Sequence, residues 1–233
     1  MWIDDQILIH HEKKLYSEVF VPKDTCVVLG AGNDASLEVN EEACQRLAIP
    51  VLRRYGGGGT VVLYPGCVVV SIGCWVKDPF QNSYYFRLLN QAIIDSLARE
   101  WPKLVDLSQA GISDIVYGEK KIAVTSMFRS RNYLLYQASV LVHLDRELVG
   151  GVLRHPTKEP DYRKGRRHGD FLTSLVETEP AIKNAMSVHT TLQTHFPAVA
   201  ARHLASDLVD PIETQMSALR GRLERAKVAE PST

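Results

Sequence analysis

The sequence predicts an α+β fold with a mainly antiparallel or mixed sheet flanked by helices. Strand-like segments rich in valine gather in two clusters, over residues 51–76 and 114–143, and helical patterns are grouped between and after them. Strands that alternate singly with helices would instead indicate parallel βαβ units. With 233 residues and 45% hydrophobic side chains, the chain is long and apolar enough to bury a core of this kind.

The first fifty residues are predicted to contain two short strands and one helix. Residues 6–9 and 25–29 are β-rich runs, and residues 30–33 follow the second run as a glycine-containing turn. Apolar side chains recur at helical spacing over residues 37–48, which predicts a helix there.

Two strands are predicted after the glycine-rich segment that follows. The apolar stretch from Thr60 to Val76 is rich in valine and is broken by Pro65 and Gly66. This pattern is typical of two strands joined by a turn, and it argues against a membrane-spanning helix.

A long helix and a meander of three strands are predicted for the middle of the chain. The helix covers residues 80–101 and ends before Pro102. Its apolar face carries Phe86, Leu89, Ile93, Leu97 and Trp101. The strands of the meander cover residues 114–117, 121–128 and 133–143, with short polar turns between them.

The last third is predicted to be a basic loop followed by helices. Residues 153–170 form an irregular loop with six Lys/Arg against three Asp/Glu, and residues 171–195 and 200–228 have helical patterns. We expect one main domain over residues 1–195, with residues 196–233 as a helical extension and tail packed on the same domain.

Charge and cysteine content exclude several classes of function. The 27 basic and 27 acidic side chains balance, so bulk charge would not draw the chain to nucleic acid or to an anionic membrane, and any anion site must be local. The four cysteines lack metal-finger spacing, and aspartates stand where a secretory signal would carry positive charge. We therefore expect a cytoplasmic protein with free thiols and with no nucleic-acid or membrane partner.

Four consecutive glycines follow two arginines between the predicted strands, as Arg53-Arg54-Tyr55-Gly56-Gly57-Gly58-Gly59. Glycines contribute no packing and weaken a strand, so this segment indicates either a tight turn or close approach of backbone N–H groups to a ligand. With two arginines beside it, an anion site is favoured over a flexible surface loop. The segment is neither a Walker loop nor a dinucleotide-binding fingerprint.

Lys120 and Lys121 stand at the start of a strand, just past a predicted hairpin turn. Successive strand residues point to opposite faces, so one lysine can face solvent while the other faces a cleft. Two solvated lysines in a turn are the commoner interpretation of such a pair.

Taken together, these motifs resemble the lipoate–protein ligase family. The segment RRYGGGGTVVLYPG is similar to the family's R-R-x-x-G-G-G-x-V-x-H-x-x-G signature, and GISDIVYGEKKIAVTSMFR is similar to its second, lysine-containing signature. The segment DTCVVLGAGN resembles the opening strand and loop. The resemblance covers roughly residues 24–175 and extends to octanoyltransferases and, more distantly, to biotin ligases.

The resemblance implies a catalytic domain of the class II synthetase/biotin-ligase type. Members of the family join lipoate to ATP with Mg²⁺, forming lipoyl-AMP and pyrophosphate, and then transfer the lipoyl group to a lysine of an acceptor protein domain. The implied ligands are therefore ATP, Mg²⁺ and lipoate, and the implied partner is a lipoyl-acceptor domain.

Individual site residues follow from matched positions in the two signatures. The resemblance implies that Lys121 is the catalytic lysine, reaching the carboxyl and α-phosphate oxygens. The implied binding residues are Arg53, Arg54, Gly57, Gly58, Gly59, Thr60, Asp114 and Ala123. Arg54 and the three glycines would cradle the acyl-adenylate, and Asp114 would lie at the nucleotide end, near the magnesium ion.

Several positions depart from the family pattern. Leu63 stands in place of a histidine, Ser113 in place of an asparagine and Val124 in place of a glycine. Gln137 and Ala138 stand where a His-Gly pair is expected. The usual N-terminal helix is not recognisable, and the chain has no room for the usual C-terminal accessory domain. These departures suggest a compact, divergent subfamily, with a separate accessory chain as a further candidate partner.

Two alternatives stay open. An octanoyltransferase of the same fold would carry the acyl group on a cysteine, yet residues 75–175 contain none, and Cys67 and Cys74 are expected in the core. A catalytically degenerate acyl- or nucleotide-binding protein is favoured by Leu63 and Val124, whereas Lys121 favours an active ligase. In such a ligase, the basic loop 153–170 would close over the anionic intermediate and exclude water.

Overall fold

Two β-sheets organise the computed structural model, which describes residues 4–228 of the chain. The strands are β1 Leu15–Phe20, β2 Cys26–Leu29, β3 Val51–Arg53, β4 Val61–Leu63, β5 Cys67–Trp75, β6 Ser108–Ala110, β7 Asp114–Tyr117, β8 Lys120–Ser130 and β9 Tyr133–Leu141. Within the described residues, the larger sheet has six strands in the order β1-β5-β9-β8-β7-β6, and the smaller has three in the order β3-β2-β4. Every neighbouring pair in the larger sheet is antiparallel, while β2 is parallel to β3.

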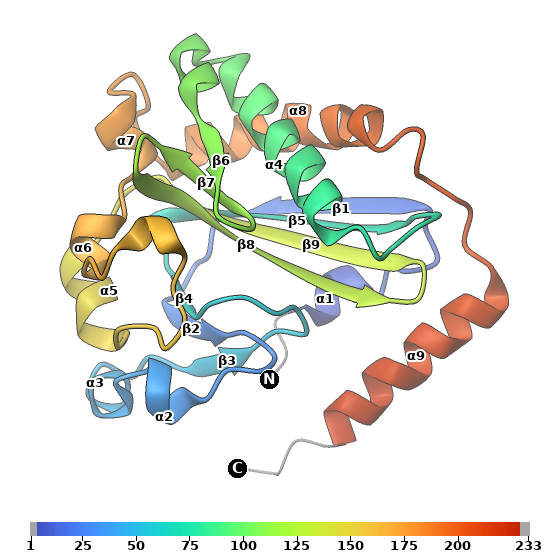
Figure 1. Cartoon of the computed structure of the whole chain (residues 1–233), viewed down its shortest axis with the longest axis horizontal. Coiled ribbons are helices and arrows are strands. Elements are labelled where there is room, and N and C mark those ends of the chain that lie inside the picture. The colour runs from blue at the N-terminus through green and yellow to red at the C-terminus, as the bar shows by residue number, and fades with distance from the viewer. Residues whose placement is uncertain (1–3, 229–233) are drawn as a thin grey trace.

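Helices surround both sheets. The α-helices are α1 Asp5–Leu8, α2 Ala35–Glu38, α3 Glu41–Arg46, α4 Asn82–Ala98, α5 Arg146–Val152, α6 His168–Phe171, α7 Leu175–Thr178, α8 Ala185–His203 and α9 Glu213–Val228, and short 3₁₀ helices cover Pro102–Asp106 and Asp161–Arg163. Figure 1 shows α4 and α8 on one side of the larger sheet and the smaller sheet on the other. The predicted α+β class with a mainly antiparallel sheet is confirmed.

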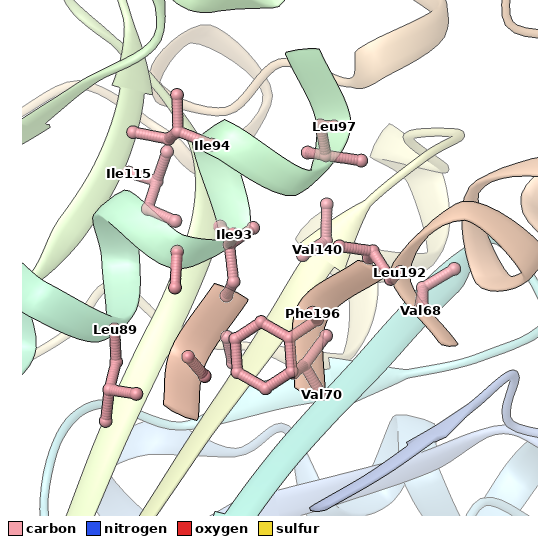
Figure 2. Close-up of a cluster of buried hydrophobic side chains, with 14 of the residues drawn as sticks. Val68, Val70, Leu89, Ile93, Ile94, Leu97, Ile115, Val140, Leu192 and Phe196 are labelled. Carbon is pink, nitrogen blue, oxygen red and sulfur yellow. The ribbon is translucent and has the colours of Figure 1, made fainter. Parts of the chain in front are cut away.

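The main core lies between the larger sheet and the pair α4 and α8. Strand alternation turns Val68 and Val70 of β5 toward these helices, where they meet Ile93 of α4 and Leu192 and Phe196 of α8 (Figure 2). These side chains are almost fully buried. The intervening β5 residues, Val69 and Ser71 among them, point to the opposite face, toward the smaller sheet. They line a cavity there.

The N-terminal prediction of a strand over residues 6–9 is wrong, because this segment is the helical turn α1. Ile7 and Leu8 are adjacent residues, and both are buried against aromatic side chains that include Tyr55 and Trp75. Adjacent residues of a strand would point to opposite faces and could not share that cluster. Two strands, β1 and β6, were not predicted.

The predicted helix over residues 37–48 is broken into α2 and α3. Val39 leaves the helix to form a bridge with Leu153, and the Asn40 side chain caps α3 by accepting a hydrogen bond from Ala43 N. The long-range contact with Leu153 therefore overrides the local helical pattern.

The two helices predicted near the C-terminus are also divided differently. Residues 171–184 hold only short helices, and α8 begins after the cap Asn184 and continues through Pro197 to His203. The break that the sequence predicted before residue 200 is absent. The break between α8 and α9 instead covers residues 204–212, which include Pro211. No helix within residues 4–228 is long and apolar enough to cross a membrane.

The C-terminal helix α9 packs on the body of the molecule through its apolar side chains. Leu219 is buried beside Ile7, Tyr55 and Phe128, and the Arg222 guanidinium lies 4.8 Å from the centre of the Phe128 ring. The division at residue 195 stays a prediction, and α8 runs across it without a break. The last five residues of the expected tail, 229–233, lie outside the described residues.

Candidate active site

The glycine-rich loop between β3 and β4 lies over the middle of β8. Gly57 N donates to Met127 O at 3.4 Å, and Ala31 N donates to Gly56 O at 3.0 Å. The loop thus joins the end of β2 to the inner face of the larger sheet. It therefore bridges the smaller and the larger sheet on the face of the larger sheet that α4 and α8 do not cover.

Gly58 is the residue of this loop that must be glycine. Its φ is +105°, and a Cβ atom there would lie 3.1 Å from Arg54 Nη2 and 3.3 Å from Thr125 O. By contrast, a Cβ on Gly57 or Gly59 would meet nothing within 4 Å. Those two positions leave their backbone open to close approach by a ligand.

Gly30 supports the glycine loop, although the sequence predicted only a turn over residues 30–33. A Cβ atom at this position would lie 2.3 Å from Gly58 O, because the β2 end and the glycine loop touch here. The signals in the sequence were the glycine itself, directly after an apolar strand, and the resemblance of the segment DTCVVLGAGN to the opening strand and loop of the family.

Gly30→Ala is expected to displace the glycine loop and to lower the free energy of unfolding by about 1–3 kcal/mol, the usual cost of overpacking. Gly32→Ala is the matched control, since a Cβ there meets nothing within 4 Å. Urea denaturation of both variants measures the difference. Equal stability of the two variants would contradict the close contact between Gly30 and Gly58.

The two arginines of the first motif hold backbone carbonyls. Arg54 donates from Nη2 to Gly57 O at 3.1 Å and to Gly59 O at 2.7 Å, and Arg53 donates from Nη1 to Gly30 O at 3.0 Å. Arg54 is 4% exposed, and its burial lowers the pKa of the guanidinium to about 10, against the opposing effect of the Asp4 and Glu38 carboxylates.

The direct action of Arg54 is therefore to shape the glycine loop, and that of Arg53 is to hold the turn after β2. Within the described residues, Arg54 Nε is buried without a hydrogen-bond partner. A direct contact of Arg54 with a bound anion stays a prediction.

A polar cluster supports the far end of the loop. Thr60 Oγ1 donates to Glu38 Oε2, and Asn33 Nδ2 donates to the same oxygen at 2.8 Å and to Gly58 O at 3.1 Å. Thr60 was predicted as a site residue, whereas Asn33 and Glu38 were not. Their sequence positions, in the turn and helix after β2, carry no motif that would have marked them.

Lys121 forms an ion pair with Asp114 across β7 and β8. Its Nζ lies 2.8 Å from Asp114 Oδ2, and each side chain is 13% exposed. Tyr162 Oη donates to the same Oδ2 at 2.8 Å. Burial and the neighbouring Asp114 raise the pKa of the Tyr162 hydroxyl, which therefore stays protonated as a donor.

A β-bulge decides which face Lys121 occupies. Ile115 pairs with Ala123, yet the next residue, Val116, pairs with Lys121, so β8 has one extra residue between these pairs. Lys121 consequently lies on the face opposite Ala123. The Ala123 side chain is fully buried in the core with α4 and α8, so only its backbone remains to fill the binding role that was predicted.

The basic loop 153–170 contributes two arginines beside Lys121. Lys121 Nζ lies 5.0 Å from the centre of the Phe171 ring, and the guanidinium carbons of Arg163 and Arg166 lie 4.8 and 5.2 Å from it. Arg163 is 4% exposed, and burial lowers its pKa. Within the described residues, its Nη2 is buried without a hydrogen-bond partner.

Three cations therefore surround one aromatic ring, with Asp114 as a close counter-charge to Lys121. The loop is not wholly irregular, since it contains a 3₁₀ turn and the start of α6, and its mobility stays a prediction. The sequence showed the excess of basic residues in the loop but did not single out Arg163 or Arg166 as the two that lie beside Lys121.

A cavity of about 520 Å³ lies between the two sheets. Its walls combine apolar side chains from both sheets with a few polar groups and include Phe20, Val28, Leu52, Arg54, Val61, Leu63, Val69, Val124, Thr125, Ser126, Gln137 and Ala138. Lys121 is not among the lining residues. It lies four residues from Thr125 along β8, roughly 13 Å at 3.3 Å per residue, and on the cavity side of the sheet.

Most departures from the family pattern line this cavity. Leu63, Val124, Gln137 and Ala138 are all in its wall, whereas Ser113 is not. Ser113 O instead accepts a hydrogen bond from Thr125 Oγ1 at 2.7 Å. The divergence of the chain is thus concentrated in the cavity and spares the Lys121–Asp114 pair.

A magnesium ion could use Asp114 as a ligand. Mg²⁺ is commonly held by one or two carboxylates together with substrate phosphates, and the Asp114 carboxylate fits the first part of this set. Within residues 4–228, no group of three or more His, Cys, Asp or Glu side chains is placed to hold a metal ion by itself. A site at Asp114 would therefore depend on phosphate oxygens.

Comparison with known proteins gives a family match over most of the chain. The family model of the lipoyl protein ligase A/B catalytic domain matches residues 1–196. Among curated proteins, lipoate-protein ligase A subunit 1 of Thermoplasma acidophilum is 29% identical over 151 residues, which cover 60% of this chain and 56% of that protein. The chain spans about half the length of the curated relatives it matches, and one relative, from Plasmodium falciparum, is described as an inactive lipoate–protein ligase.

Solved structures share the fold. A bipartite lipoate protein ligase of Thermoplasma acidophilum, studied with its E2 lipoyl domain, is 20% identical with a TM-score of 0.68 and covers 96% of this chain and 90% of its own. Lipoate-protein ligase A bound with ATP is 22% identical with a TM-score of 0.68 and covers 97% of this chain and 89% of its own. At these identities the likeness establishes the fold, a class II synthetase-like α+β domain.

Proposed function

The chain belongs to the lipoyl protein ligase A/B catalytic domain family, and we propose that it is an ATP-dependent ligase for lipoate or a similar short carboxylic acid. It would activate the acid as acyl-AMP and transfer the acyl group to a lysine of an acceptor protein domain. One observation carries this proposal: a largely apolar cavity and the Lys121–Asp114 pair lie along the same face of the sheet, with the glycine loop over that face.

The first step needs fixed positive charge. A carboxylate oxygen of the acid bonds to the α-phosphorus of ATP, and the bond from that phosphorus to the pyrophosphate oxygen breaks. Two anions must be held together while negative charge grows around phosphorus, so cations placed in advance stabilise the transition state. Lys121, Arg163 and Arg166 supply such charge around Phe171. A magnesium ion held by Asp114 and the phosphates would neutralise further charge on the nucleotide.

The cavity suits the acyl tail. Its apolar wall removes methylene groups from water, at about 0.8 kcal/mol for each one buried. The open backbone at Gly57 and Gly59 lies over the same face and would admit the carboxyl and phosphate end of the intermediate. The tail would thus anchor the acid while the loop and Lys121 act on its carboxyl group.

The second step transfers the acyl group to an amine. The lysine amine of the acceptor attacks the acyl carbon, AMP leaves with the bonding electrons, and the amine loses a proton. A relative of the same fold is described as a bipartite ligase with an E2 lipoyl domain. We therefore expect a lipoyl-acceptor domain as partner and a second protein chain as a candidate accessory subunit.

The thiol route of an octanoyltransferase is disfavoured by the state of the cysteines. Burial raises the pKa of Cys26 and Cys67 to about 11 and that of Cys74 to about 12, and it also raises the pKa of Cys44. A nucleophilic cysteine needs a lowered pKa, so none of the four is prepared to accept an acyl group. A catalytically degenerate binding protein remains the second candidate, since one relative is described as inactive and Leu63 and Val124 alter the cavity.

Mass analysis of an acceptor domain separates these functions. The chain is incubated with a lipoyl domain in three mixtures: lipoate with ATP and Mg²⁺, lipoate without ATP, and octanoyl-loaded carrier protein without ATP. The proposal expects a lipoyl-sized mass gain in the first mixture alone. Gain only from the carrier protein would indicate a transferase, and no gain in any mixture, with or without a candidate accessory chain, would favour the degenerate protein.

A further inference from the structure

Four polar side chains cross the floor of the cavity in direct register. Glu18 of β1 pairs with Ser71 of β5, Ser71 pairs with Gln137 of β9, and Gln137 pairs with Ser126 of β8. All four line the cavity, so they face the same side of four adjacent strands. Residues in direct register lie side by side, which makes this row one continuous polar strip.

The strip contrasts with the walls around it. Phe20 and Val69 stand beside the row on the same face, and Leu52, Val61 and Leu63 come from the smaller sheet. The tail of a purely hydrocarbon acid would leave a polar strip in contact with methylene groups. Such a mismatch costs free energy, because buried polar groups need hydrogen-bond partners.

Glu18 is the charged member of the strip, and among residues 4–228 its carboxylate has no protein partner. Gln137 Nε2 donates to Ser71 Oγ at 3.3 Å, whereas among residues 4–228 no hydrogen bond or ion pair involves the half-buried Glu18 carboxylate. An ionised carboxylate can only accept hydrogen bonds, so its natural complement is a donor. This acceptor points into the cavity with its capacity unused.

The strip also has a direction. Its Ser126 end lies beneath the glycine loop, where a Cβ on Gly56 would come within 3.2 Å of Ser126 Oγ. Its Glu18 end lies on the edge strand β1, three strand spacings away, or roughly 14 Å at about 4.8 Å each. An acid whose carboxyl group lies at the glycine loop would therefore place the tip of its tail near Glu18.

We propose that the acid this chain activates carries a hydrogen-bond donor, a hydroxyl or an amine, near the distal end of its tail, and that Glu18 accepts it. Gln137 and Ser71 position the tail along the strip. This inference rests on the proposed function and narrows its substrate to short acids with a polar tip. A hydrogen bond to a charged acceptor inside a cavity discriminates on the order of 10- to 100-fold against the analogue that lacks the donor.

Pyrophosphate exchange into ATP tests this substrate class. The probes are octanoate, ω-hydroxyoctanoate and ω-aminooctanoate, which share one chain length and differ only at the tip; lipoate is included as a reference. For the unaltered protein we expect kcat/KM to be on the order of 10- to 100-fold higher for the two donor acids than for octanoate. The difference should lie in KM, because the tip is remote from the reacting carboxyl group.

Glu18→Leu should reverse this preference, because kcat/KM should fall for the two donor acids and rise for octanoate. Glu18→Gln keeps an acceptor oxygen without the charge. Its kcat/KM should therefore stay high for ω-hydroxyoctanoate and fall for ω-aminooctanoate. Glu100→Leu, in the exposed turn after α4, is the matched control and should keep the original order. Thermal melts show whether each variant is folded.

The outcomes distinguish the role of Glu18 in substrate choice from the formation of the acyl-adenylate itself. Octanoate or lipoate matching the donor acids in the unaltered protein, or folded Glu18 variants with an unchanged order of acids, would overturn the role of Glu18 while leaving the ligase intact. No exchange with any acid would refute adenylate formation itself, and the inference would fall with it.

Discussion

Lys121→Ala is expected to lower the rate of acyl-adenylate formation on the order of 10²–10³-fold, the loss typical of removing one preorganised group that stabilises transition-state charge. Lys121 Nζ is held 2.8 Å from Asp114 Oδ2 on the cavity side of the sheet. The ion pair fixes the ammonium before substrate arrives, so no reorganisation is needed during the reaction.

Stability should fall much less than activity. Tyr162 still donates to Asp114 Oδ2 in the variant, so the carboxylate keeps a partner and the loss should be about 2 kcal/mol. Lys120→Ala is the control: Lys120 is exposed, and its replacement should be nearly neutral for both properties. AMP formation and urea denaturation are measured for both variants. Equal activity of the two, or a collapsed fold in Lys121→Ala, would refute the assigned role.

Arg54→Met is expected to destabilise the protein by about 3 kcal/mol and to abolish activity. The guanidinium is almost fully buried and donates to the carbonyls of Val28, Gly57 and Gly59, which would lose their partner inside the protein. The glycine loop would then lose its shape even where the chain stays folded.

Arg53→Met is the matched comparison for this effect. Arg53 also holds backbone carbonyls, but it is only half-buried, so water can replace its hydrogen bonds. Its loss should be about 1 kcal/mol. Urea denaturation measures both values, and a change for Arg54→Met no larger than that for Arg53→Met would show that the buried arginine does not hold the loop.

Local patterns in the sequence predicted the central strands β5, β9, β8 and β7 of the larger sheet but missed its edge strands β1 and β6. The apolar run over residues 60–76 and the meander over 114–143 form strands because their alternation and turns agree with the tertiary pairing. Cys67 and Cys74 are fully buried, as expected from their place in the apolar strands. The family resemblance further brought Lys121 and the glycine loop into one hypothesis.

Features that depend on distant pairing were missed. The bulge that turns Lys121 away from Ala123 appears only when β7 is placed beside β8, since strict alternation would put both residues on one face. Gly30 is required by its contact with Gly58, which lies 28 residues away. Glu18 can be recognised as part of a polar strip only once β1, β5 and β9 are paired, which places it in line with Ser71 and Gln137. No local periodicity carries such information.

The division of the helices failed for a similar reason. Residues 37–48 have helical spacing, yet the bridge of Val39 to Leu153 breaks the helix. The predicted gap between the helices over residues 171–195 and 200–228 lies inside α8, which continues through Pro197 to His203. Tertiary contacts outweigh local propensity at these places, because they contribute more free energy than the fraction of a kcal/mol that separates most residue propensities.

Acid-dependent exchange of labelled pyrophosphate into ATP is the most direct test of the central claim, because it reports acyl-adenylate formation without any acceptor. The account predicts exchange that requires a short carboxylic acid and Mg²⁺, and that is lost in Lys121→Ala and retained in Lys120→Ala. Absence of exchange with every acid in the panel, for a folded protein assayed alone and with a candidate accessory chain, would contradict the account.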